Sequence, residues 1–216
     1  MIGNPEEELI TDDANKVNAE LVDDLDYDYR PSELIALQDD PKIRAKLDKY
    51  WGIVQNQFTL INPIRPGKKL LVLDLDYTLF DMKGEPDASG WRVLRRPYTH
   101  RFLTACYQHY ELVIWSQTSW RWLELKLTEL GILTHTDYRI LFVMDKTSMF
   151  RIESPHNGEI RKHHVKPLEL IWRKFSHWSK ANTIHIDDLG RNFALNPQTG
   201  LKIKPVRNNE DNKSLS

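Results

Sequence analysis

An apolar run followed by two alternating aspartates constrains the fold of this chain more than any other feature. Residues 69–72 (KLLV) predict a strand buried on both faces of a parallel sheet, and residues 73–80 (LDLDYTLF) follow it directly. This order places Asp74 and Asp76 at the carboxyl end of the strand, where open α/β sheets build their sites. Two carboxylates so close perturb each other's pKa, so the pair favours a metal or a catalytic task. Taken alone, the pair could also be a strand that ends in a polar turn.

Composition excludes several classes of protein. A length of 216 residues leaves room for one domain with a sizeable core and an appendage, and the formal net charge of -1 does not favour nucleic acid as a partner. Cys106 is the only cysteine, which excludes an internal disulfide and suits a reducing compartment. No apolar run reaches membrane-spanning length and no signal peptide opens the chain, so we expect a soluble protein without a membrane partner.

The chain divides into four parts by composition. Residues 1–31 hold ten acids against two bases and predict a flexible acidic linker. Residues 32–63 form a helical lead-in, in which Asp40 caps a helix and the apolar face comprises Ile43, Leu47, Tyr50, Trp51 and Val54. The main domain is predicted over residues 64–206, and residues 207–216 are a polar tail.

Strands and helices alternate in the main domain. Strands are predicted at 69–74, 112–115 and 183–186, with a further strand and a hairpin within 139–165 that turns at 155–158. Helices are predicted at 97–110, at 119–130 and from Pro167. The apolar face expected for the second helix comprises Trp122, Leu123, Leu125, Leu127 and Leu130. This alternation predicts an α/β fold, a Rossmann-like parallel sheet with helices on both faces and a small β-hairpin insertion. The segment between Phe80 and Arg96 is too short for a large cap domain.

Polar groups from four strand ends and loops converge in this fold. They are Asp74 and Asp76, Ser116 and Thr118, Lys166, and Asp187 with Asp188. Carboxylates suit a hard cation such as Mg²⁺, while hydroxyl and ammonium groups can bind a phosphoryl group. Each motif alone has a simpler interpretation as a turn residue, a solvated lysine or a helix cap. Their joint occurrence favours phosphoryl transfer, with an aspartate as the nucleophile.

The ordered motifs resemble the haloacid dehalogenase superfamily, and within it the phosphatases that act on the C-terminal domain (CTD) of RNA polymerase II. The resemblance covers roughly residues 64–206 and includes the motifs DLDYTL, RPY, VIWS, VKPL and DDLGRNF. Within that branch, the chain most resembles the ubiquitin-like domain-containing CTD phosphatases. Their biology implies a protein that dephosphorylates phosphoproteins and acts on the proteasome regulatory particle. The implied location is the nucleus, with the cytoplasm as a second location.

The resemblance implies the role of each acidic residue. Asp74 would attack phosphorus, and Asp76 would act as general acid and then as general base. Mg²⁺ would be held by the Asp74 carboxylate, the Asp76 backbone carbonyl and Asp188, with Asp187 supporting the site. The activity implied is that of a protein serine/threonine phosphatase, expected to be a monomer.

The resemblance also assigns the remaining polar residues. Ser116, Thr118 and Lys166 would bind the phosphoryl group, and Ser116 and Lys166 would also stabilise its negative charge during the reaction. Thr78 would support the loop that follows the first strand.

Two departures and two alternatives accompany this interpretation. The chain opens with an acidic stretch where those relatives would have finished their ubiquitin-like domain, so we expect that domain to be absent, and it ends soon after Val206, where a terminal helix would be expected. A catalytically silent scaffold that binds a protein partner is one alternative, and a phosphatase of small metabolites is another. The intact aspartates and Lys166 favour an enzyme, and the missing cap domain favours a macromolecular substrate.

Other reactive residues are assigned no catalytic role. Cys106 is not followed by an arginine six residues on, as a cysteine-dependent phosphatase requires, and it is predicted to lie in the core. His163 and His164 are predicted to be exposed loop residues and not metal ligands.

Overall fold

A five-stranded parallel sheet forms the centre of the protein in the computed structural model, which describes residues 33, 37–156 and 158–207. The strands lie in the order β3-β2-β1-β6-β7, and every neighbouring pair is parallel. Their bounds are Lys69–Leu73 (β1), Tyr110–Trp115 (β2), Ile140–Met144 (β3), Thr183–Asp187 (β6) and Gly200–Lys202 (β7). The predicted acidic linker and all but the first residue of the predicted tail lie outside the described residues.

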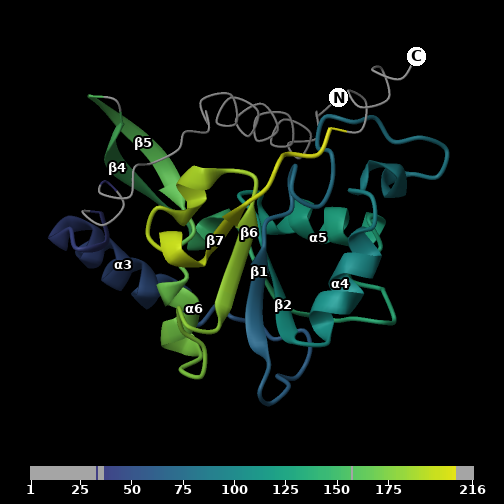
Figure 1. Ribbon diagram of the computed structural model, residues 1–216, viewed down its shortest axis with the longest axis horizontal. Coiled ribbons are helices and arrows are strands. Elements are labelled where there is room, and N and C mark those ends of the chain that lie inside the picture. The colour runs from purple at the N-terminus through teal and green to yellow at the C-terminus, as the bar shows by residue number, and fades with distance from the viewer. Residues whose placement is uncertain (1–32, 34–36, 157, 208–216) are drawn as a thin grey trace, which may run out of the picture.

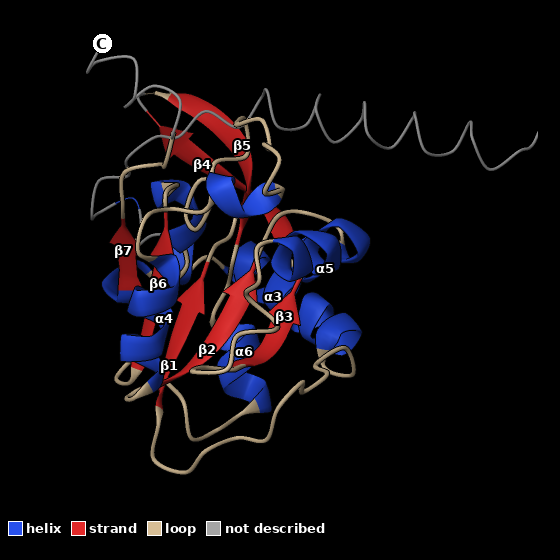
Figure 2. Cartoon of the chain, turned by 90° about the vertical axis from the view of Figure 1, so that its right-hand side faces the viewer, coloured by secondary structure: helices blue, strands red, loops and turns tan. Residues whose placement is uncertain are grey.

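Helices cover both faces of this sheet. They are α3 (Pro41–Val54), α4 (Thr99–Tyr107), α5 (Trp120–Glu129) and α6 (Glu169–Lys174). In Figure 1, α3 and α6 lie on one side of the sheet and α4 and α5 on the other. Short 3-10 helices occupy Trp91–Leu94 (η1), Lys146–Ser148 (η2), Gly190–Phe193 (η3) and Pro197–Thr199 (η4). Figure 2 shows the strands side by side with helices packed against them. The predicted α/β architecture is confirmed.

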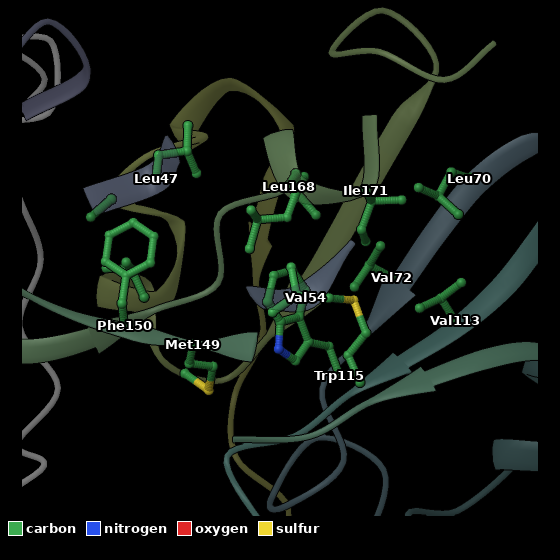
Figure 3. Close-up of a cluster of buried hydrophobic side chains, with 14 of the residues drawn as sticks. Leu47, Val54, Leu70, Val72, Val113, Trp115, Met149, Phe150, Leu168 and Ile171 are labelled. Atoms are coloured by element: carbon green, nitrogen blue, oxygen red, sulfur yellow. The ribbon is translucent and has the colours of Figure 1, made fainter. Parts of the chain in front are cut away.

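Two hydrophobic clusters explain why the central strands β1 and β2 carry apolar side chains on both faces. Along β1, Leu70 and Val72 pack into the cluster with α3 and α6, whereas Leu71 and Leu73 pack into the cluster with α4 and α5. Figure 3 shows the first cluster, in which Leu70 and Val72 lie near Ile171. A strand covered on both faces needs apolar side chains in both directions. The same alternation anchors β2, so both central strands are fixed in register by the two layers.

The predicted lead-in helix is confirmed as α3. The Asp40 carboxylate accepts a hydrogen bond from the Lys42 amide at 2.8 Å and caps the first turn. Pro41 suits the first helical position because it has no backbone N–H that would need a partner there. Its buried face, Ile43, Leu47 and Val54, joins the cluster beside α6. The lead-in helix therefore packs against the main domain as part of its core.

The predicted hairpin is confirmed and leads directly into the site. Strands β4 (Phe150–His156) and β5 (Glu159–Val165) pair antiparallel, and Lys166 follows β5. His163 was predicted to be exposed in a loop, which is wrong. It lies in β5, is buried, and its Nε2 atom is 3.2 Å from the Ser154 hydroxyl, because the hairpin packs one of its faces against the domain.

Three predicted boundaries need correction. The helix predicted over 97–110 extends only from Thr99 to Tyr107, because Tyr98 has a left-handed φ of 65° and Tyr110 already belongs to β2. The last helix begins at Glu169 rather than at Pro167. Strand β7 was not predicted, because three residues at the sheet edge give too short a pattern.

The predicted apolar face of α5 was partly wrong. Trp122 and Leu125 are 44% and 42% exposed, whereas Lys126 is 5% exposed. Leu123 and Leu127 are buried as predicted. The helical period of 3.6 residues places position 126 on the same face as 123 and 127, so a lysine enters the protein in place of the two apolar residues.

Candidate active site

The candidate site lies where three neighbouring strands end. Because β1 pairs with β2 on one side and with β6 on the other, the polar residues after these strands meet at one edge of the sheet. Asp74 follows β1, Ser116 follows β2, and Asp187 ends β6. The ladder continues into the site, since the Asp74 amide donates to the Ile186 carbonyl at 2.9 Å and the Ser116 amide donates to the Met144 carbonyl at 3.0 Å. The sheet therefore fixes the backbone on which the site is built.

Asp74, Asp187 and Asp188 form a compact group that we call the acid cluster. One carboxylate oxygen of each lies within 4.8 Å of the others, and all three residues are buried. Burial raises the pKa of Asp74 well above its usual range, against the opposing charge of Lys166. Burial and the neighbouring Asp187 raise the pKa of Asp188 to about 7. A divalent cation would offset this repulsion, and oxygen ligands suit a hard cation, so the cluster could hold a metal ion.

Lys166 joins two members of the acid cluster. Its Nζ atom donates to Oδ1 of Asp74 at 2.5 Å and to Oδ2 of Asp187 at 2.7 Å, and the residue is fully buried. Burial alone would lower the pKa of Lys166, but Asp187 and Asp74 outweigh it and raise that pKa. Burial likewise opposes ionisation of Asp187, yet Lys166 and His185 hold the pKa of that carboxyl below its usual range. The ammonium group of Lys166 is therefore charged, and it is held by hydrogen bonds to the side chains of Asp74 and Asp187.

Asp187 and Asp188 differ in how fully their oxygens are engaged. Both oxygens of Asp187 accept from the Asn192 amide at 2.9 Å, and the Leu189 amide donates to Oδ1. The Asp188 carboxylate accepts a long hydrogen bond of 3.4 Å from the Thr78 hydroxyl, and no other side chain of the described residues donates to it. Asp188 therefore has more oxygen capacity left for a metal ion, whereas Asp187 acts as the acceptor that fixes Lys166.

Thr78 and Arg96 hold the loop that carries the aspartates. The Thr78 hydroxyl accepts from the Asp188 amide at 3.2 Å, and the Thr78 carbonyl accepts from Nε of Arg96 at 2.7 Å. Arg96 also reaches the Lys204 carbonyl at 2.6 Å. The loop turns at Tyr77, whose left-handed φ of 59° is uncommon for a bulky residue. These contacts tie the turn to the end of β6 and to the segment after β7.

The second half of the site, which we call the Asp76 group, comprises Asp76, Ser116, Thr118 and Lys126. Oδ2 of Asp76 accepts from the Ser116 hydroxyl at 3.0 Å and from the Thr118 hydroxyl at 2.8 Å. Oδ1 accepts from the Lys126 ammonium at 2.6 Å. Three donors, two from the loop after β2 and one from α5, thus converge on one carboxylate, which is not a member of the acid cluster.

The structure brings all eight predicted site residues to one edge of the sheet. It adds Lys126, Asn192 and His185, to which no role was assigned. Asn192 lies within the DDLGRNF motif, so its proximity to the acids was available from the sequence. Lys126 lies on the same helical face as Leu123 and Leu127, but this spacing alone does not identify it, because lysine side chains are usually exposed. His185 lies in β6, and its Nε2 atom is 3.4 Å from Asp187.

None of the helices among the described residues is long and apolar enough to cross a membrane. This finding agrees with the hydropathy of the sequence.

Comparisons with known proteins place this geometry in a family. The chain is 43% identical over 189 residues to ubiquitin-like domain-containing CTD phosphatase 1 of Homo sapiens, which covers 87% of this chain and 56% of that protein. It is 41% identical over 218 residues to the ubiquitin-like domain-containing CTD phosphatase of Arabidopsis thaliana, which covers 99% of this chain and 60% of that protein. The chain thus spans somewhat more than half the length of these relatives.

A solved structure is also similar. It is a variant of the fission yeast RNA polymerase II CTD phosphatase Fcp1 bound to beryllium fluoride, with a TM-score of 0.40 and 16% identity. That match covers 77% of this chain and 45% of the other. Residues 69–216 match the family described as NLI interacting factor-like phosphatase, and the chain belongs to that family.

Proposed function

We propose that this protein is a Mg²⁺-dependent phosphatase that hydrolyses phosphoserine and phosphothreonine through an aspartyl-phosphate on Asp74. The observation that supports this most strongly is the placement of Asp74 in the acid cluster, bound to Lys166 and beside the Asp76 group. Nucleophile, fixed positive charge and a candidate proton donor are the parts that phosphoryl transfer requires. Membership of a phosphatase family supports the same proposal.

The chemistry of the first step follows from the hydrogen bonds of Asp74. Lys166 occupies Oδ1, so we assign the attack to Oδ2. As the bond between Oδ2 and phosphorus forms, the bond between phosphorus and the serine or threonine oxygen breaks. Asp76, which enters this step protonated, gives that oxygen its proton and becomes the carboxylate, and Lys166 keeps Asp74 in the orientation for attack.

The second step restores the free carboxylate of Asp74. A water oxygen attacks phosphorus while Asp76 takes a proton from that water, and the bond between phosphorus and Asp74 breaks. Inorganic phosphate leaves. The hydroxyls of Ser116 and Thr118 each have one hydrogen, which Asp76 accepts in this structure. Either hydroxyl would turn from Asp76 to donate to a phosphoryl oxygen when the substrate binds.

The acid cluster fits Mg²⁺ by its chemistry. Asp74 and Asp188 would supply carboxylate oxygens, and the backbone carbonyl of Asp76 would supply a third ligand. Asp187 would support the site, because its oxygens are already engaged by Lys166 and Asn192. When bound, Mg²⁺ would supply positive charge that offsets the charge of the phosphoryl group.

The proposed substrates are phosphoproteins rather than metabolites. Residues 81–95 contain only the short helix η1, and the other insertion is the hairpin β4–β5, so the described chain offers little to enclose a small substrate. The relatives are named CTD phosphatases. We infer action on phosphosites like those of the RNA polymerase II CTD or on the proteasome regulatory particle, in the nucleus and with the chain as a monomer.

Phosphate release from phosphopeptides tests the proposal. The panel contains phosphoserine and phosphothreonine peptides from the CTD repeat and from proteasome subunits, assayed with Mg²⁺ and with EDTA. We expect release only with Mg²⁺ and inhibition by beryllium fluoride, which mimics a phosphoryl group on a carboxylate. EDTA-insensitive hydrolysis would contradict the mechanism. Absence of any turnover by a folded chain would favour the scaffold alternative.

A further inference from the structure

Lys126 is a buried lysine that has no role in the reaction proposed above. It lies on α5, is 5% exposed, and its ammonium group is 2.6 Å from Oδ1 of Asp76 and 3.3 Å from the Thr118 hydroxyl. The Phe80 ring lies 5.3 Å from the same ammonium group. An apolar side chain at this position would pack against Phe80 and against the buried leucines of the helix without the cost of desolvating a charge.

The three donors to Asp76 are distributed unevenly over its two oxygens. Ser116 and Thr118 both donate to Oδ2, and Lys126 donates to Oδ1. Two donors on one oxygen leave the carboxylate able to turn about that oxygen. A third donor on the other oxygen fixes its plane. Because Lys126 comes from a helix rather than from the loop of Asp76, it ties this orientation to the α/β framework.

We propose that Lys126 is a positioning residue that holds the carboxyl group of Asp76, through Oδ1, in the orientation from which its protonated form gives a proton to the leaving oxygen. This inference rests on the proposed function, in which Asp76 is the general acid. The contribution of a group that acts through orientation can be large, since a displacement of about 1 Å can cost about 100-fold in rate. Lys126 acts on the reaction only through Asp76 and does not itself bind the phosphoryl group.

The basicity of the leaving oxygen separates this role from a structural one. A nitrophenolate leaves without a proton near neutral pH, whereas the alkoxide of serine requires one. Loss of an oriented acid therefore slows the hydrolysis of a phosphoserine peptide and spares a nitrophenyl phosphate, and acid catalysis contributes about 10²–10⁴-fold. Loss of a phosphoryl-binding cation, or general loosening of the site, would slow both substrates alike.

The experiment compares both substrates in Lys126→Met, Lys126→Gln and Lys126→Arg. We expect kcat/KM for a phosphoserine peptide to fall by at least about 30-fold in Lys126→Met and for p-nitrophenyl phosphate to fall by less than about threefold. Lys126→Arg keeps a charged donor and should recover part of the peptide activity. Lys174→Met is the control, because Lys174 also donates from a helix, to the Gln55 carbonyl at 2.8 Å, but it is exposed and lies on α6, on the opposite face of the sheet from α5.

The outcomes separate the two proposals. Equal losses on both substrates, or a loss confined to KM, would overturn the positioning role of Lys126. If thermal unfolding shows that Lys126→Met does not fold, Lys126→Gln takes its place. Because it keeps a donor without the charge, we expect a smaller loss that is again confined to the phosphoserine peptide, and equal losses on both substrates would overturn the positioning role. Failure of the wild-type protein to hydrolyse either substrate would instead refute the proposed phosphatase function.

Discussion

The two halves of the candidate site neutralise their carboxylates in different ways. In the acid cluster, three buried carboxylates share one ammonium group, that of Lys166, so negative charges outnumber positive ones. In the Asp76 group, one carboxylate has its own ammonium group, that of Lys126, and two hydroxyl donors. Buried charge without compensation is costly. The comparison indicates that the acid cluster could hold a cation, whereas the carboxylate of the Asp76 group already has a counter-charge.

The two halves of the site also differ in burial. Lys166 is enclosed between Asp74 and Asp187, and none of its side chain is exposed. The carboxylate that Lys126 binds retains 15% exposure of its side chain. A proton donor must reach both the substrate and water, so partial exposure suits Asp76, and enclosure suits a nucleophile whose charge must be held fixed.

The largest expected effect separates the nucleophile from the proton donor. Asp74→Asn is nearly isosteric but removes the attacking oxygen, so we expect turnover to fall by many orders of magnitude while thermal unfolding shows an intact fold. Asp76→Asn should be nearly as inactive but should accumulate phosphoenzyme, which acid-stable labelling from a radioactive phosphopeptide would detect. Residual activity of Asp74→Asn above about a hundredth of wild type would contradict its role as nucleophile, because acid–base assistance alone supplies about 10²–10⁴-fold.

The second effect concerns the stability that each lysine provides. Lys166→Met leaves two buried carboxylates without their cation, and we expect the free energy of unfolding to fall by about 3–5 kcal/mol. Lys126→Met should cost less than about 2 kcal/mol, because Asp76 is partly solvated and keeps its hydroxyl donors. Urea denaturation without Mg²⁺ measures both values. An equal or larger loss in Lys126→Met would remove the distinction between the two halves.

The third effect concerns the two acids at the end of β6. Asp188→Ala should raise the Mg²⁺ concentration required for half-maximal activity by about 100-fold or more, because it removes a proposed ligand. Asp187→Ala should raise it by about 10–100-fold, as expected when a group that supports the ligands is lost. Asp187→Ala should be the less stable variant, since Lys166 and Asn192 both lose an acceptor. The reverse order of Mg²⁺ requirements would show that the terminal pair is assigned wrongly.

Much of the fold was predictable because its signals are local. The apolar run before Asp74 and the alternation of strands and helices predict a parallel sheet, and strand ends in such a sheet must meet at one edge. Asp40 and Pro41 together predict the start of α3, and the structure confirms it. Each of these signals depends on neighbouring residues, whose types are read directly from the sequence.

The remaining features depend on contacts that are distant in sequence. Lys126 is buried because Asp76, fifty positions earlier, supplies its counter-charge. A lysine between leucines is otherwise expected to face solvent. The left-handed turn at Tyr98 carries no glycine or asparagine to mark it, and it shortened α4 by two residues relative to the prediction at that end. Tertiary pairing overrides local preference at Lys126, whereas the side chain of Tyr98 is 78% exposed and only its backbone conformation departs from the prediction.

The smallest expected effect concerns the preference of the site for phosphopeptides over sugar phosphates. Every phosphomonoester brings a phosphoryl group to the acid cluster, but only a large substrate can supply binding energy from parts distant from phosphorus. A peptide segment between the 81–95 loop and the β4–β5 hairpin could exclude water from Asp74, whereas a sugar phosphate could not. We expect kcat/KM for phosphopeptides to exceed that for sugar phosphates by at least about tenfold, or roughly 1.4 kcal/mol of transition-state binding.

Shortening the hairpin around residues 155–158 should weaken peptide turnover and spare small aryl phosphates, which serve as the control. Equal or better turnover of metabolite phosphates, measured by phosphate release under identical Mg²⁺, would overturn the protein-phosphatase proposal and leave the fold unaffected.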